Sequence, residues 1–90
     1  MTTQRSNRPL PELKNLGPSI VKRLDGVGIR SEGDLRRVGP ARAYLAMQRR
    51  ERTRLPVCYY LYSLAGALED RHWDDLSVKE RQALLEKVGR

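Results

Sequence analysis

Two similar stretches decide how this chain folds: residues 13–18, LKNLGP, and residues 35–40, LRRVGP. Each stretch combines two apolar residues with a basic residue between them and closes on Gly-Pro. Proline is tolerated in the first turn of a helix, because the N–H that it lacks has no intrahelical partner there. We therefore expect each stretch to end one helix and begin the next, as in a duplicated helix–turn–helix pair.

The apolar spacing around these stretches is helical throughout. Ser31 and Ser77 are good N-caps, and each has an acidic residue three positions later. Apolar residues at i, i+3/i+4 and i+7 make residues 55–69 the expected central core helix, with Cys58 on its buried side. No run shows the alternation that a strand requires. The spacing predicts five helices, at about 18–26, 31–38, 41–51, 55–69 and 77–88.

Length and composition agree with one small intracellular domain. Ninety residues allow a single domain, and we expect a compact all-α, five-helix fold over residues 10–90 after a disordered or extended lead-in at 1–9. The single cysteine cannot form an internal disulfide, which suits a reducing cytoplasm. Residues 1–9 hold no apolar signal core, and the nearly apolar residues 55–68 are too short to span a bilayer. The expected location is cytoplasmic, without membrane contact.

The positive charge is concentrated in the first part of the chain. The formal net charge is +7, from 18 Lys and Arg against 11 Asp and Glu. Residues 1–54 contribute +8 and residues 55–90 contribute −1. This asymmetry favours a half that faces a polyanion and a half that is structural. The alternative is a solvated basic surface that keeps a small protein soluble.

The Gly-Pro steps and the arginine-rich run at residues 49–54 are the candidate nucleic-acid contacts. N–H groups just after each Gly-Pro belong to a helix N-terminus, which favours a phosphate, although the usual hairpin has Gly-x-Gly and here proline removes one donor. The alternatives are that Gly-Pro only punctuates helices and that the arginines stabilise a helix C-terminus. The predicted nucleic-acid-binding residues are Gly17, Ser19, Lys22, Arg23, Arg36, Arg37, Gly39, Arg42, Arg49, Arg50 and Arg54.

The tyrosine-bearing helix is the candidate protein interface. Tyr59 and Tyr62 are three residues apart, so we expect them near one helical face, where they would pack against a partner chain or, alternatively, into the core. His72, Asp74 and Asp75 lack the further His or Cys that a metal or acid–base site would need. We expect no catalytic residue, no metal and no cofactor.

An ordered series of motifs identifies a family resemblance. The series is Leu13-x-Asn15-Leu16-Gly17-Pro18, Leu24-x-x-Val27-Gly28-Ile29, Asp34-Leu35, Gly39-x-x-x-Ala43-Tyr44, Leu64-x-Gly66-Ala67-Leu68-x-x-x-His72-Trp73 and Leu76. From about Leu10 to Val88 the chain resembles the C-terminal domain of the TfoX/Sxy competence regulators. The resemblance implies a helical domain related to helix–hairpin–helix and SAM-like folds, and a bacterial role in regulating DNA-uptake genes. Family members usually carry an N-terminal α/β domain as well, so a stand-alone C-terminal domain is expected here.

Two functions follow as hypotheses. The first is a non-enzymatic regulator that contacts the DNA backbone, or a transcription factor, with low sequence specificity. The second is a protein-interaction or homodimerisation module that binds no DNA directly.

Overall fold

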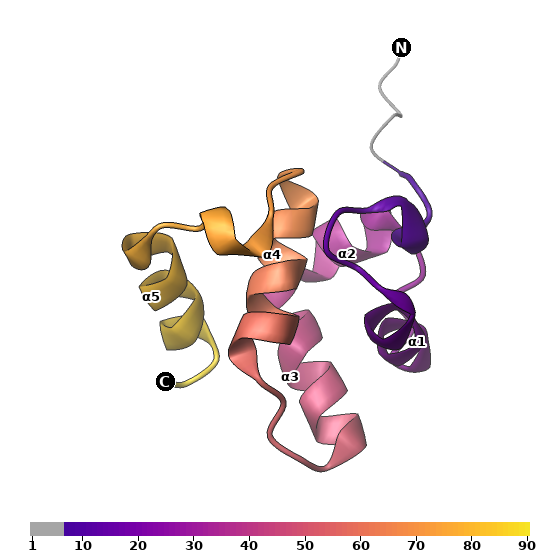
Figure 1. Cartoon of the computed structure of the whole chain (residues 1–90). Helices are drawn as coiled ribbons and strands as arrows, with labels where there is room; N and C mark the ends of the chain where they lie inside the picture. The colour runs from indigo at the N-terminus through magenta and orange to yellow at the C-terminus, as the bar shows by residue number, and fades with distance from the viewer. Residues whose placement is uncertain (1–6) are drawn as a thin grey trace.

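Five α-helices follow one another along residues 7–90, the part of the chain that the computed structural model describes (Figure 1). The helices are α1 (Pro18–Gly26), α2 (Glu32–Val38), α3 (Pro40–Glu51), α4 (Tyr62–Leu68) and α5 (Val78–Lys87). Short 3-10 turns span Leu10–Glu12 and Trp73–Asp75, and a π-helical turn spans Val57–Leu61. Within residues 7–90 no strand forms, so the predicted all-α, five-helix fold is confirmed. None of the helices described is long and apolar enough to cross a membrane.

Helix α4 lies at the centre of the domain, with α3 and α2 packed against it and α1 and α5 on opposite sides (Figure 1). Tyr44 of α3, Leu24 of α1 and Leu64 of α4 are completely buried in one hydrophobic cluster. Burying each such side chain contributes about 1.5–3 kcal/mol. Helix α5 has no buried residue and covers the cluster only with partly buried side chains such as Leu84 and Leu85.

The two Gly-Pro stretches adopt different structures. Gly39 has φ +89° and is at once the C-cap of α2 and the N-cap of α3, so it joins two helices as predicted. Gly17 has φ −83°, and the residues before it bend irregularly instead of ending an α-helix. The prediction of a duplicated helix–turn–helix pair is therefore wrong for the first copy. A β-carbon would meet no atom within 4 Å at either glycine, but the positive φ of Gly39 strains any other residue there, whereas the φ of Gly17 does not.

Asn15 explains why the first copy differs. Its φ of +75° turns the chain before α1, a conformation that asparagine tolerates better than most residues. Its side-chain Nδ2 donates to the carbonyls of Ser63 (3.3 Å) and Arg71 (2.9 Å), and its Oδ1 accepts from the N–H of Trp73 (3.2 Å). The first stretch therefore fastens the N-terminal part of the chain to α4 and the turn after it.

The fourth predicted helix begins with a π-turn instead of at residue 55. The N–H of Tyr62 donates to the carbonyl of Val57, five residues back, before regular α4 begins. The wider turn shifts the register, and residues 60–64 are all buried because this segment is enclosed by the rest of the fold. Cys58, predicted to lie in the core, is instead exposed.

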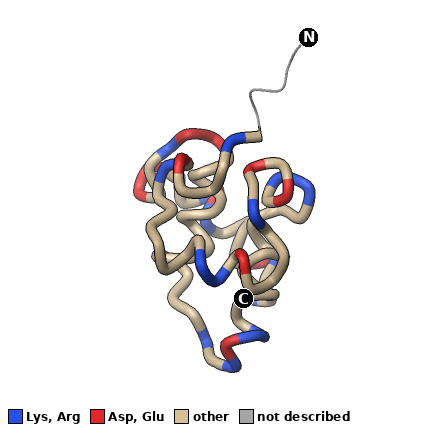
Figure 2. The backbone as a smooth tube through the Cα atoms, turned by 90° about the vertical axis from the view of Figure 1, so that its right-hand side faces the viewer, with Lys and Arg blue, Asp and Glu red and all other residues tan. Residues whose placement is uncertain are grey.

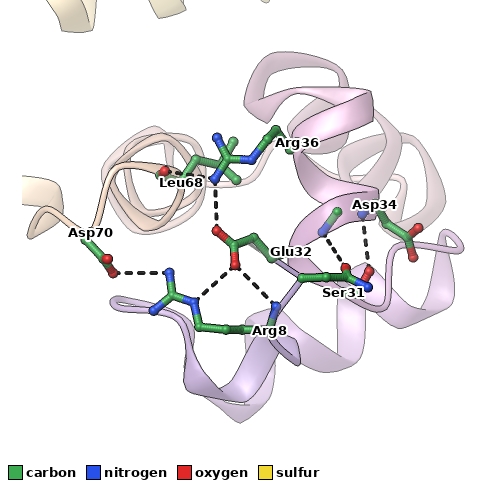
Figure 3. A network of polar contacts seen from close by, with 9 residues as sticks. Arg8, Ser31, Glu32, Asp34, Arg36, Leu68 and Asp70 are labelled. Atoms are coloured by element: carbon green, nitrogen blue, oxygen red, sulfur yellow. Dashed lines mark hydrogen bonds and ion pairs between the residues drawn. The ribbon is translucent and has the colours of Figure 1, made fainter. Parts of the chain in front are cut away.

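The expected lead-in is ordered where the structure describes it. Residues 1–6 lie outside the described part, whereas Arg8 and Pro9 run alongside Ser31 and Glu32 in an isolated antiparallel bridge. The buried Glu32 carboxylate accepts from the Arg8 backbone N–H (3.3 Å) and Nε (3.1 Å), and from the Arg36 guanidinium (2.9 Å) (Figure 3). Arg8 also reaches Asp70 (3.4 Å). These pairs join Arg8 to α2 and to the residues after α4.

Candidate nucleic-acid interface

Cationic side chains gather where the C-terminal ends of α1 and α3 meet. Lys22, Arg23 and Arg50 line one hollow between these helices, together with Gly26 and Glu51. At the bottom of Figure 2, where helix α3 ends, basic segments lie on both sides of a single acidic segment. We call this group the basic end. Its members are Lys22, Arg23, Arg49, Arg50, Arg52 and Arg54.

Tertiary contacts join the C-terminal ends of α1 and α3. A β-carbon on Gly26 would lie 2.9 Å from Arg50 Nε, so glycine at this position lets the Arg50 side chain lie across the end of α1. Arg23 approaches Glu51 at 3.7 Å and donates to the Ser19 hydroxyl at 2.7 Å. Helix α3 ends at Glu51, and its C-cap Arg52 has a left-handed φ of +58° and donates its N–H to the carbonyl of Gln48. The chain then turns away, and Arg54 follows in the connecting loop.

The cations of the basic end other than the half-buried Arg23 are exposed, and most members of the group have no acidic partner within residues 7–90. Among residues 7–90, Arg23 with Glu51 is the ion pair that this group forms. A helix dipole favours cations only within the last turn, which covers Arg49 and Arg50 but not Arg54, which lies beyond the end of α3. Free guanidinium groups offer two parallel N–H donors to a phosphate. The basic end is therefore chemically suited to polyanion contact.

The remaining predicted contacts lie elsewhere. Arg36 is paired with Glu32 and donates to the carbonyl of Leu68 (3.3 Å), and Arg37 is paired with Asp34. Arg42 lines a separate hollow with Gly39 and Lys87. This hollow shares no lining residue with the one at the basic end. The structure thus separates the second Gly-Pro step from the arginine-rich run, although they lie on the same helix.

The first Gly-Pro step adjoins the basic end through α1. Gly17 lines a mostly apolar hollow together with Leu16, Val21 and Lys22, and Lys22 also lines the hollow at the basic end. The Ser19 hydroxyl is engaged by Arg23. Of the predicted residues, the structure brings together Lys22, Arg23 and Arg50 in one hollow.

Three carboxylates that arginines hold have a lowered pKa. The Arg8 side chain lowers the pKa of Glu32, the Arg30 backbone N–H lowers that of Asp34, and the Arg71 guanidinium lowers the pKa of Glu80 to about 2. Each of these shifts stabilises the ionised form, which acts as a structural anion. No group of three His, Cys, Asp or Glu residues that could hold a metal ion occurs within residues 7–90.

The two predicted interface tyrosines do not form one surface. Tyr62 is buried in the core, with the Arg81 guanidinium 5.6 Å from its ring centre. Tyr59 is 50% exposed and meets Tyr60 edge to face, with ring centres 4.9 Å apart. The π-turn separates the two side chains, and its presence could not be inferred from their spacing of three residues.

The sequence prediction omitted Arg52 of the basic end and Tyr60, which contacts it. Arg52 belongs to the arginine-rich run at residues 49–54, and the density of charged residues in that run predicts the exposed position that Arg52 has. Tyr60 stacks its ring beneath the Arg23 guanidinium, which lies 5.7 Å from the ring centre. No sequence signal linked α1 to this tyrosine, because the contact depends on how distant parts of the chain are brought together in the fold.

Comparison with known proteins identifies the family. No curated protein matches the chain significantly. An uncharacterized protein from Listeria monocytogenes, solved in a triclinic crystal form, is 28% identical with a TM-score of 0.76 and 84% coverage of both chains. A protein of unknown function from the same organism, solved in a tetragonal form, is 27% identical with a TM-score of 0.77, covering 87% of this chain and 94% of the other. Residues 6–88 match the TfoX C-terminal domain, and the chain belongs to that family.

Proposed function

We propose that this protein is a non-enzymatic regulatory module that binds the phosphate backbone of DNA through its basic end. The observation that carries the proposal is that Lys22, Arg23 and Arg50 line one hollow at the meeting ends of α1 and α3. The exposed Arg49, Arg52 and Arg54 follow at the end of α3 and form no ion pair within residues 7–90. Flexible arginines at helix ends and in a loop contact phosphates without reading bases. Low intrinsic sequence specificity follows from this geometry.

The regulatory part of the proposal is supported by family membership. For a TfoX C-terminal domain we propose a cytoplasmic role in the control of DNA-uptake genes. Backbone contact of low specificity fits an auxiliary regulator, because another factor bound to the same DNA would then supply the sequence recognition.

A salt titration of duplex binding tests the proposal. Each phosphate neutralised on B-DNA adds about 0.9 to the slope of log affinity against log salt concentration. Replacing both Arg49 and Arg50 by Ala should therefore weaken binding to unrelated duplexes equally and reduce the slope by about 1.8. The matched control is the double replacement of Lys79 and Lys87 by Ala. These two exposed lysines on α5 form no ion pair within residues 7–90 and carry the same total charge.

The control separates a local site from net charge. If both double variants weaken DNA binding by the same factor, the basic end is not a binding site. If the Arg49 and Arg50 replacement leaves affinity and slope unchanged, DNA binding through this surface is refuted.

A second candidate function, protein binding, is favoured by the apolar hollow beside α1. Leu10, Pro11 and Val21 contribute to its lining, and Lys22 and Arg30 lie at the same hollow. If this hollow mediates homodimerisation, sedimentation velocity should detect a dimer that Val21→Glu dissociates. A wild-type monomer at high micromolar concentration would refute the dimer.

A further inference from the structure

The basic end continues into an exposed aromatic side chain. Tyr59 is one of two large hydrophobic residues exposed in residues 7–90; the other, Val78, lies at the start of α5. The Tyr59 ring meets the Tyr60 ring edge to face, at an interplanar angle of 86°. The Tyr60 ring in turn lies under the Arg23 guanidinium of the basic end. An unbroken row of contacts therefore links Tyr59 to the cationic hollow.

The surroundings of Tyr59 hold its position while leaving the ring accessible. Its neighbours Tyr60 and Leu61 are buried, so the backbone on its C-terminal side is anchored in the core. In an edge-to-face contact the partner covers at most one face of a ring, so Tyr60 leaves at least one face of Tyr59 uncovered. A tyrosine also loses little conformational entropy on contact, because it has only two side-chain torsions.

We propose that Tyr59 is a stacking platform for an unpaired base, so that the basic end binds single-stranded DNA in preference to duplex. This inference rests on the proposed DNA function and deepens it. Proteins that bind single strands combine a cationic surface for the backbone with an exposed aromatic ring for the bases. In a duplex the base faces are already stacked on one another, so an isolated ring beside the backbone gains nothing from them. The combination of Tyr59 with Arg23, Arg50 and their neighbours is of the single-strand kind.

The test compares ligands that share a backbone and differ in bases. The probes are a fluorescent oligothymidine of about 12 nucleotides, an abasic oligomer of the same length and a duplex. Wild-type protein should bind oligothymidine about fivefold or more tightly than the abasic strand, since stacking one base on an aromatic side chain is worth about 1–3 kcal/mol. Tyr59→Ala should remove that difference and leave abasic and duplex affinities unchanged. Tyr59→Phe should keep it.

Matched variants keep the outcome interpretable. Tyr59→Leu retains apolar volume without an aromatic face and should behave like Tyr59→Ala, even if the alanine variant folds poorly. Val78→Ala, at the other exposed hydrophobic residue, should bind all three probes as wild type does. If Tyr59→Leu retains the preference for oligothymidine, the stacking proposal is overturned. If wild-type protein binds none of the probes, the proposed DNA function fails as well, so the two failures are distinguishable.

Discussion

Replacing Glu32 by Ala should destabilise the domain at its N-terminal edge. The Glu32 side chain is 3% exposed and accepts hydrogen bonds from the Arg8 backbone, the Arg8 side chain and Arg36 (Figure 3). These contacts join residues 8–9, α2 and the end of α4, where Arg36 reaches the Leu68 carbonyl and Arg8 reaches Asp70. The alanine variant removes the shared acceptor of the whole network.

The magnitude follows from what the substitution leaves behind. Deleting one partner of a fully buried ion pair costs about 3–5 kcal/mol, because a charge is stranded without water. Here the side chains of Arg8 and Arg36 are 34% and 51% exposed and can be rehydrated. The loss of charged hydrogen bonds to Glu32 remains, and we expect the free energy of unfolding to fall by about 2–3 kcal/mol. That is a large share of the 5–15 kcal/mol typical of a domain.

Urea denaturation followed by circular dichroism measures the loss. The control is Glu12→Ala, because Glu12 is exposed and forms no ion pair within the described chain; its stability should change by less than about 0.5 kcal/mol. The pKa of Glu32 is lowered, chiefly by the Arg8 side chain, from an ordinary value of 4.5. Its contribution is therefore complete above pH 4.5 and is lost as the pH falls through the lowered pKa. A destabilisation no larger than that of Glu12→Ala, or one that persists in acid, would refute the network's role.

Four further substitutions test other parts of the fold. Gly39→Ala should lower the free energy of unfolding by about 1–3 kcal/mol in thermal or urea denaturation, because φ is +89° there. Gly17→Ala should change it by less than about 1 kcal/mol. Equal effects would contradict the structural difference between the two Gly-Pro stretches. Asn15→Ala should cost about 1–3 kcal/mol in the same assay, since it removes three part-buried hydrogen bonds, and a neutral result would show that these bonds do not hold the chain. The Arg71 guanidinium lowers the pKa of Glu80 to about 2, so Glu80 stabilises the fold above pH 4.5 and loses that contribution as the pH falls toward 2. Glu80→Gln should therefore flatten the curve of melting temperature against pH between about pH 4.5 and 2. An unchanged curve would count against a stabilising role of the Arg71–Glu80 ion pair.

Helix positions follow from local chemistry, and the sequence therefore predicts them well. Ser31 and Ser77 cap their helices through the N–H groups of Asp34 and Glu80, as their spacing indicates. The π-turn could not be predicted in the same way. Residues 60–64, which begin inside the π-turn and continue into α4, are all buried, and this run of five depends on tertiary packing rather than on local spacing. Cys58 lies in the same turn and is exposed.

The candidate site was predictable in part, for a physical reason that differs from residue to residue. Arg36 lies four residues after Glu32, a spacing at which a helix brings opposite charges together, so its neutralisation was visible in the sequence. Arg23 meets Glu51 only because α1 packs against α3. The sequence shows where the cationic residues are, whereas tertiary packing determines which of them lie beside a carboxylate and which do not.

This division of the arginines bears directly on the proposed function. A basic surface that serves only solubility needs no particular arrangement, and net charge alone is sufficient for it. In this domain Arg8, Arg36 and Arg71 are bound to carboxylates in structural networks, while four arginines within residues 49–54 form no ion pair with any residue the structure describes. Helix-dipole stabilisation needs cations only in the last turn of α3, and part of the run lies beyond that turn. A solvated basic surface needs no such division, and the helix dipole does not explain the part of the run beyond the last turn, so the arrangement supports the proposed phosphate binding.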